Sequence, residues 1–169
     1  MRSLAEADAR LSAAMRMAEN HRFIRTLAAF LAHSGDSWFW LIGLALLWWF
    51  GTDYWKARAI AFAIGVIATA AVVFAIKFLV RRRRPEGEWG QIYRQTDPHS
   101  FPSGHAARGV MLAVLAMGIG PTWLGAVLLP WAFLVGLARV SLGVHYLSDV
   151  LAGMLVGVVM GWAVMGLPF

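Results

Sequence analysis

The nine residues "KFLVRRRRP", numbered 77 to 85, mark the point where a long apolar segment of the chain ends in a run of cations. The preceding segment, residues 59–80, contains no charged side chain except Lys77. As a helix rising about 1.5 Å per residue it would be about 33 Å long, which matches the hydrocarbon core of a bilayer. The stretch therefore predicts a membrane-spanning helix with a strongly basic end.

The composition of the whole chain also indicates a membrane protein. Of its 169 residues, 60% are hydrophobic and only 14% are charged, whereas soluble domains are about half apolar and about a quarter charged. The chain has no Cys, which excludes disulfides, thiolate metal sites and a Cys nucleophile. In so apolar a chain, the net charge of +6 favours anionic lipid headgroups over nucleic acid as the counter-charge.

Charge-free stretches predict five transmembrane helices. The stretch 109–138 is too long for one span and is interrupted by the turn-forming sequence "GIGPTW" at 118–123, so it predicts two helices. The expected spans cover residues 37–52, 59–80, 106–119, 122–138 and 150–167. The expected fold class is all-α, a polytopic membrane helix bundle that forms a single domain over residues 1–169.

Residues 1–35 differ from the rest because apolar side chains alternate with arginines and acids at helical spacing. The segment lacks the apolar core of a cleavable signal peptide. We predict an N-terminal amphipathic helix lying in the membrane interface, with a soluble tail as the alternative. The transmembrane core then covers residues 36–167.

The order of the five predicted spans places the chemically active side chains on one membrane face. The end of the second span, the start of the third, the end of the fourth and the start of the fifth all meet there. The opposite face carries only Asp53, Lys56, Arg58 and short turns. The residues expected on the active face are Lys77, Arg84, Ser103, Gly104, His105, Arg139, His145 and Asp149.

The cations of this set predict a site for an anion, and a phosphoryl group fits best. Arg84 and Arg139 suit bidentate phosphate oxygens, while Lys77 adds a point charge inside the apolar run. In the sequence "PSGH", residues 102–105, Gly104 lets the backbone approach a ligand at a helix N-terminus, where free N–H groups favour an anion. Ser103 adds a hydroxyl donor.

Two histidines and one carboxylate complete a possible catalytic set. His145 and Asp149 are four residues apart, so on one helix the carboxylate can fix the tautomer of the imidazole. That is the pair a histidine nucleophile needs. His105 comes from a different helix and is free to act as general acid on the leaving oxygen.

Each of these features has a simpler reading when taken alone. An arginine run is often a membrane-flank anchor, and we keep that interpretation for Arg81, Arg82 and Arg83. The histidine–aspartate pair can be structural, and "PSGH" can be a turn and helix start. Arg108 can project toward the site or reach the headgroups. The other histidines, His21, His33 and His99, are interpreted as interfacial.

Three ordered motifs resemble those of the type 2 phosphatidic acid phosphatase (PAP2) superfamily. "KFLVRRRRP" resembles the first motif through Lys77, Arg84 and Pro85, and "PSGH" matches the second in full. The third motif is matched by the residues Arg139, His145 and Asp149. Its serine is replaced by Ala138. The resemblance covers about residues 36–167.

The resemblance implies a metal-independent phosphatase without a cofactor that works through a phosphohistidine. His145 would be the nucleophile, Asp149 its orienting carboxylate, and His105 the acid. The phosphoryl oxygens would be held by Lys77, Arg84, Arg139, Ser103 and the Gly104 amide. Vanadium haloperoxidases share the pocket, but they are larger soluble proteins, and the apolar composition argues against that branch.

The expected function is hydrolysis of a lipid phosphate: a phosphatidate, a phosphatidylglycerophosphate, or a polyprenyl mono- or diphosphate. The alternatives are a non-catalytic lipid-phosphate binder or carrier and a structural membrane protein. We expect a multi-pass protein of a cell membrane, a bacterial inner membrane above all. The positive-inside rule favours a cytoplasmic site, whereas many family members face outward. The Gly-rich segment "AGMLVGVVMG", residues 152–161, leaves open whether the last span packs within the monomer or in an oligomer.

Overall fold

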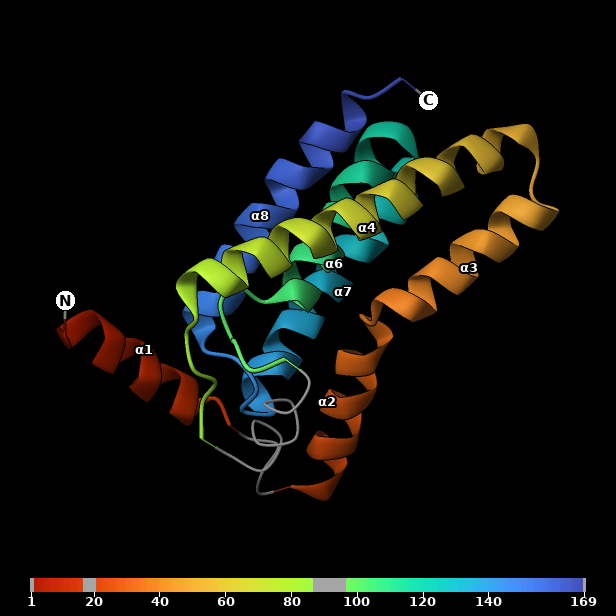
Figure 1. Ribbon diagram of the computed structural model, residues 1–169. Helices are drawn as coiled ribbons and strands as arrows, with labels where there is room; N and C mark the ends of the chain where they lie inside the picture. Colours follow the sequence, from red (N-terminus) through yellow and green to blue (C-terminus); the bar gives the residue numbers. More distant parts are fainter. Residues whose placement is uncertain (1, 17–20, 87–96, 169) are drawn as a thin grey trace.

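The regular structure of the chain is helical. A computed structural model describes residues 2–16, 21–86 and 97–168, and within these ranges the β-structure is limited to an isolated bridge between Arg83 and His99. This confirms the predicted all-α class. The helices, shown in Figure 1, are α1 (Arg2–Ala14), α2 (Arg22–Ser34), α3 (Ser37–Phe50), α4 (Asp53–Val80), α6 (Gly104–Ile119), α7 (Thr122–Ser141) and α8 (Leu147–Met165).

The helix α6 forms the centre of the bundle. It packs against α7, α8 and α4, while α3 packs mainly against α4 and lies at the edge of the molecule (Figure 1). The side chains of Met111, Leu112 and Leu115 on α6 are completely buried against Val66 of α4 and Leu128 of α7. The apolar core therefore fixes α6, whose N-terminus carries the "PSGH" segment.

All five predicted spans correspond to helices. Three of these helices, α4, α7 and α8, are long and apolar enough to cross a membrane. The pair α2 and α3 passes the same test when taken together, with a bend of 53° between them, and α6 is a shorter apolar helix. The helix α4 begins at Asp53, earlier than residue 59, because an acid in the first turn complements the helix dipole. The chain is a multi-pass membrane protein.

The N-terminal segment contains two helices rather than the one expected over residues 1–35. In Figure 1, α1 and α2 lie apart from each other near the same end of the bundle. The helix α2 buries Ala28 and Ala32 beside Ala138 at the end of α7. Small side chains allow this close approach, while Phe23 and Phe30 on α2 stay exposed. The helix α1 instead contacts the beginning of α8.

The glycines of α8 pack within the monomer. A Cβ atom added to Gly157 would lie 2.3 Å from the carbonyl oxygen of Ala107, and one added to Gly153 would lie 2.4 Å from that of Ser103. Both distances are far below contact distance, so α6 and α8 touch through their backbones. The sequence left open whether the last span packs within the monomer or in an oligomer. Gly153 and Gly157 pack within the monomer, where they form the α6–α8 contact.

Replacing Gly157 with alanine should destabilise the protein because the added methyl group forces α6 and α8 apart. Overpacking of this kind costs about 1–3 kcal/mol. Gly43→Ala on α3 is the matched control, since a Cβ there meets no atom within 4 Å and alanine favours the helix. Thermal unfolding in detergent measures the stability of both variants. Equal midpoints for the two variants would contradict the packing described here.

Candidate active site

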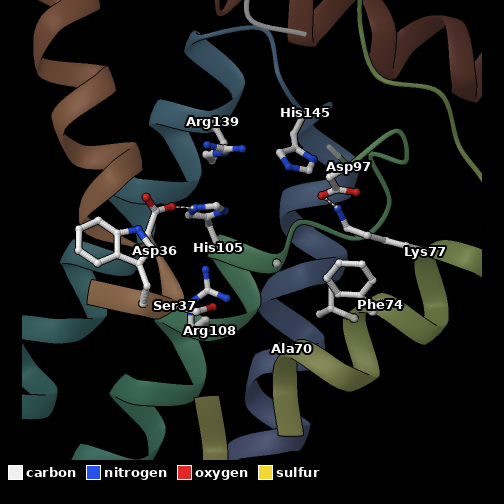
Figure 2. A pocket seen from close by; sticks show the side chains of 13 residues that line it. Asp36, Ser37, Ala70, Phe74, Lys77, Asp97, His105, Arg108, Arg139 and His145 are labelled. Atoms are coloured by element: carbon white, nitrogen blue, oxygen red, sulfur yellow. Dashed lines mark hydrogen bonds and ion pairs between the residues drawn. The ribbon is translucent and has the colours of Figure 1, made fainter. Parts of the chain in front are cut away.

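Five of the eight predicted site residues line a cavity of about 410 Å³ at the end of the bundle where α6 begins, and Arg84, Ser103 and Asp149 lie outside its lining. Figure 2 shows side chains from α3, α4, α6 and α7, and from the connections that carry Asp36, Asp97 and His145, converging on it. The predicted residues that line it are Lys77, Gly104, His105, Arg139 and His145. On one side the wall is apolar, formed by Val73 and Phe74 of α4 and by Trp38 of α3.

His145 lies in the connection between α7 and α8 with its two ring nitrogens in different surroundings. Its Nδ1 atom is 3.6 Å from Oδ2 of Asp149, and its Nε2 atom is 3.2 Å from Nη1 of Arg84. The sequence argument placed His145 and Asp149 on one helical turn. In the structure His145 precedes α8, and Asp149 belongs to its first turn. The ring therefore turns Nδ1 toward the carboxylate and Nε2 toward a cation.

The surroundings of His145 favour its neutral form. Burial lowers the pKa of this imidazole well below its usual value, and the positive charges of Arg139, Arg84 and Lys77 lower it further. A neutral ring keeps a lone pair on one nitrogen, and a nucleophile requires that lone pair. The buried cations around His145 thus favour an uncharged imidazole.

Asp149 is held rigidly behind His145. The carboxylate is completely buried, its Oδ2 atom accepts a hydrogen bond of 2.9 Å from the amide of Tyr146, and Oδ1 accepts one of 2.7 Å from Nη1 of Arg82. The backbone carbonyl of Asp149 accepts a further bond from the amide of Ser103. These bonds connect the second and third sequence motifs and fix the carboxylate beside the imidazole.

His105 has a carboxylate partner that the sequence analysis missed. Its Nε2 atom is 2.7 Å from Oδ1 of Asp36, which lies between α2 and α3 (Figure 2). The second oxygen of Asp36 is 3.2 Å from Nδ1 of His33. In the sequence Asp36 served only as the boundary of an apolar span. No spacing connects residues 69 positions apart, so only the fold brings this pair together.

Asp97 is a second carboxylate that the sequence did not single out. It accepts a hydrogen bond from Nζ of Lys77 and, through Oδ2, one of 2.8 Å from Nη2 of Arg84. Arg84 also donates to the carbonyl of Val144, at 2.8 Å. The guanidinium thus joins the segment around Asp97 to the loop of His145. A shared carboxylate holds both cations toward the same region.

Arg139 and Arg108 supply two further buried cations. Both line the cavity, and Figure 2 shows Arg139 near both His105 and His145. Arg108 donates through Nε and Nη2 to the carbonyl of Gly35, at 3.0 and 2.6 Å. The sequence left Arg108 between a site role and a headgroup role. The structure places it in the site, where it holds the turn that carries Asp36.

The two central residues of "PSGH" take different positions. Gly104 begins α6 and lines the cavity, so a helix N-terminus opens into the site. Ser103 is completely buried outside the cavity lining, and its amide binds the Asp149 carbonyl. The structure therefore brings the helix end to the cavity but does not bring the Ser103 side chain to its surface.

The anchor interpretation is wrong for Arg82. Its side chain is only 26% exposed, forms ion pairs with Asp149 and Asp8, and packs over the ring of Tyr146 at 4.0 Å. The reason lies in the backbone, because Arg81 ends α4 in a left-handed conformation, with φ of 50°, and the chain turns there. The side chains of Arg81 and Arg83 remain exposed, and a headgroup role for them stays a prediction.

Ala138, which replaces the motif serine, faces α2 rather than the cavity. It is 4% exposed and belongs to an apolar cluster with Ala28 and Ala32. A hydroxyl at this position would have to be buried among methyl groups. The replacement fits the packing of α2 on α7 and leaves the cavity lining intact.

Sequence comparisons agree with the motifs. The model of the PAP2 superfamily matches residues 58–169. The decaprenylphosphoryl-5-phosphoribose phosphatase of Mycobacterium tuberculosis is 35% identical over 133 residues, which cover 78% of this chain and 73% of that protein. The undecaprenyl-diphosphatase of Sulfolobus acidocaldarius is 31% identical over 137 residues, covering 78% of this chain and 64% of its own length.

Solved structures show the same fold. The transmembrane PAP2-type phosphatidylglycerolphosphate phosphatase of Bacillus subtilis superposes with a TM-score of 0.81 at 22% identity, over 98% of this chain and 86% of its own. LpxE of Aquifex aeolicus gives a TM-score of 0.75 at 23% identity, over 94% of each chain. With the family model matching about two thirds of the chain and three motifs gathered in one site, this protein belongs to the PAP2 superfamily.

Proposed function

We propose that this PAP2 protein hydrolyses a phosphate ester or diphosphate of a membrane lipid through a phosphohistidine on His145. One observation carries the proposal: Nε2 of the buried His145 lies beside Arg84, at a cavity that His105 and Arg139 also line. A nucleophile, an acid and phosphate-binding cations are the parts that phosphoryl transfer requires.

In the first step the phosphoryl oxygens bind Lys77, Arg84, Arg139 and the amide of Gly104. The Nε2 lone pair of His145 forms a bond to phosphorus while the bond from phosphorus to the lipid oxygen breaks. His105 gives its proton to that oxygen, and the leaving group departs as an alcohol or, from a diphosphate, as a lipid monophosphate. Asp149 stabilises the positive charge that develops on the His145 ring.

In the second step water releases the phosphate. His105, now neutral, accepts a proton from a water molecule, and the resulting hydroxide attacks phosphorus as the bond to Nε2 breaks. His145 returns to its neutral form and His105 returns to its protonated form. Burial and the positive charges of Arg139 and Arg108 lower the pKa of the His105 imidazole well below its usual value. Asp36 opposes this shift and favours the protonated form that the cycle needs, because its carboxylate lies 2.7 Å from the His105 ring.

The substrate class that we propose is a polyprenyl-linked phosphate. The two relatives described above are named as phosphatases of polyprenyl-linked substrates. The apolar wall supports a long-chain lipid, because Trp38 and Phe74 line the cavity while 63% and 51% of their surfaces are exposed on the outside of the bundle. A hydrocarbon chain could stay in the bilayer while its phosphate reaches the cations.

Phosphate release by detergent-solubilised protein tests the proposal. The panel contains a polyprenyl diphosphate, a polyprenyl-linked sugar phosphate, phosphatidate and phosphatidylglycerophosphate, each with EDTA and with or without vanadate. We expect turnover that resists EDTA, is inhibited by vanadate, and is fastest for a polyprenyl-linked lipid. Faster hydrolysis of phosphatidate would overturn the substrate class, and binding without turnover would support a carrier instead.

We propose that the active site faces the cytoplasm. Among the lysines and arginines that the structure describes, only Lys56 and Arg58, at the beginning of α4, lie toward the opposite end of the bundle, and cytoplasmic loops are enriched in such residues. Because the chain has no Cys, single cysteines can be labelled with a membrane-impermeant maleimide in intact spheroplasts. We expect Thr52→Cys to react at once and Glu86→Cys to react only after lysis. The reverse pattern would place the site outside.

A further inference from the structure

The N-terminal helix α1 caps the helix that carries Asp149. The hydroxyl of Ser12 accepts a hydrogen bond of 2.9 Å from the amide of Leu147, and Oδ1 of Asp8 accepts one of 3.1 Å from the amide of Ser148. These are the first two residues of α8. Amides at the start of a helix lack partners within it, and here side chains more than 130 positions earlier satisfy them.

Asp8 also reaches Asp149 through one arginine. Its Oδ2 atom accepts a hydrogen bond of 2.7 Å from Nη2 of Arg82, and Nη1 of the same guanidinium donates to Oδ1 of Asp149 at 2.7 Å. The Ser148 hydroxyl completes the group, since it donates to Asp8 at 2.5 Å and accepts from Arg82 at 2.6 Å. The arginine therefore lies between two carboxylates, one on α1 and one behind the nucleophile.

The network is largely shielded from solvent and charged. Asp149 is completely buried, Asp8 is 15% exposed and Ser12 is 2% exposed. Burial alone would raise the pKa of the Asp8 carboxyl, but hydrogen bonds from Ser148 and Arg82 outweigh it and bring this pKa below its usual value. Shielded charge-assisted hydrogen bonds are the strong class of such bonds, so the contact is more than an exposed ion pair.

From this geometry we infer that α1 is a clamp on the catalytic carboxylate, with Asp8 and Arg82 as positioning residues for Asp149 and His145. The inference rests on the proposed function. Without Asp8, Arg82 loses one of its two carboxylates and the start of α8 loses a cap. The carboxylate behind His145 then samples more orientations, and a displacement of about 1 Å can cost about 100-fold in rate.

The clamp predicts a specific kinetic signature. In the described residues, Asp8 contacts none of the phosphate-binding cations Lys77, Arg84 and Arg139, so substrate binding should be preserved. We expect Asp8→Ala to lower kcat about 10–100-fold with KM changed by less than about twofold. Asp8→Asn keeps an oxygen for the Ser148 amide but removes the charge, so it should lower kcat by less than Asp8→Ala does. A purely structural cap would leave kcat of the folded fraction unchanged.

The matched control is Glu6→Gln. It removes one negative charge from the same helix at an exposed position, so kcat and KM should both stay as in the wild type. Kinetics are measured on the full chain in detergent, and size-exclusion chromatography determines the folded fraction. If Asp8→Ala fails to fold, kcat and KM of Asp8→Asn are compared with those of the wild type instead. Unchanged kcat in the folded Asp8 variant, or an equal loss in Glu6→Gln, would overturn the clamp.

Amide hydrogen exchange separates this inference from the proposed function. The amides of Leu147 and Ser148 should exchange slowly in the wild type, and at least tenfold faster in the Asp8 variant. Exchange that is equally fast in both proteins would show that α1 does not hold α8, and the clamp would be wrong even in an active enzyme. If no lipid is hydrolysed by the wild type, the proposed function fails, while the docking of α1 is still decided by this exchange.

Discussion

His145→Gln should abolish phosphate release from every lipid, with a loss of about 10⁴-fold or more. Losses of this size follow when the nucleophile of a covalent enzyme is removed. The glutamine amide can still accept a hydrogen bond from Arg84 but has no lone pair basic enough to attack phosphorus. Lys77, Arg84 and Arg139 remain in place, so binding of the lipid phosphate should fall far less than turnover.

Trapping the intermediate identifies the atom that carries the phosphoryl group. Wild-type protein mixed with substrate and quenched in base should yield a peptide containing His145 with one added phosphoryl group, and His145→Gln should not. His21→Gln is the matched control, because His21 is exposed and lies outside the cavity. A phosphorylated peptide from another residue, or residual turnover above about 1% in the variant, would rule out the proposed mechanism.

His105→Gln should give the second largest effect, and its size should depend on the leaving group. Loss of a general acid costs about 10²–10⁴-fold when the leaving oxygen needs a proton. A lipid alkoxide needs one, whereas the anion of p-nitrophenol departs without it. We therefore expect phosphoryl transfer from a lipid to slow strongly in this variant, and transfer from p-nitrophenyl phosphate to slow much less.

Asp36→Asn should show the same dependence on the leaving group with a smaller loss. The asparagine can still orient His105 through its oxygen but cannot stabilise the imidazolium by charge. The measurement is the rate of phosphoenzyme formation with both substrates in wild type, His105→Gln and Asp36→Asn. Equal losses on both substrates in both variants would mean that His105 and Asp36 do not act on the leaving oxygen.

Local sequence patterns determined the membrane class and predicted that several site residues lie close together. Apolar stretches of spanning length predict helices wherever they occur, because every backbone group in a bilayer must bond within its own helix. The order of the spans then assigns each helix end to a face. For this reason Lys77, His105, Arg139 and His145 could be placed together from the chain alone, and the structure lines one cavity with all four.

The tertiary structure decided which carboxylates serve these residues. Asp36 and Asp97 lie between helices and Asp8 lies on α1, and each contacts the site across 13 to 74 positions of the chain. The same holds for Arg82, which looks like its neighbours in a run of four arginines but turns inward because the backbone bends at Arg81. Sequence spacing carries no information about such contacts.

The difference between what the sequence predicts and what only the tertiary structure shows has a physical cause. Burial in a bilayer and helix periodicity act over a few neighbouring residues, so the sequence by itself determined the apolar helices α3 to α8, their order and the end of the bundle at which the cavity-lining residues meet. A hydrogen bond forms only within about 3 Å and at a narrow range of angles. Whether Asp36 meets His105, or Asp8 meets Arg82, therefore depends on how whole helices pack, and only the tertiary structure decided it.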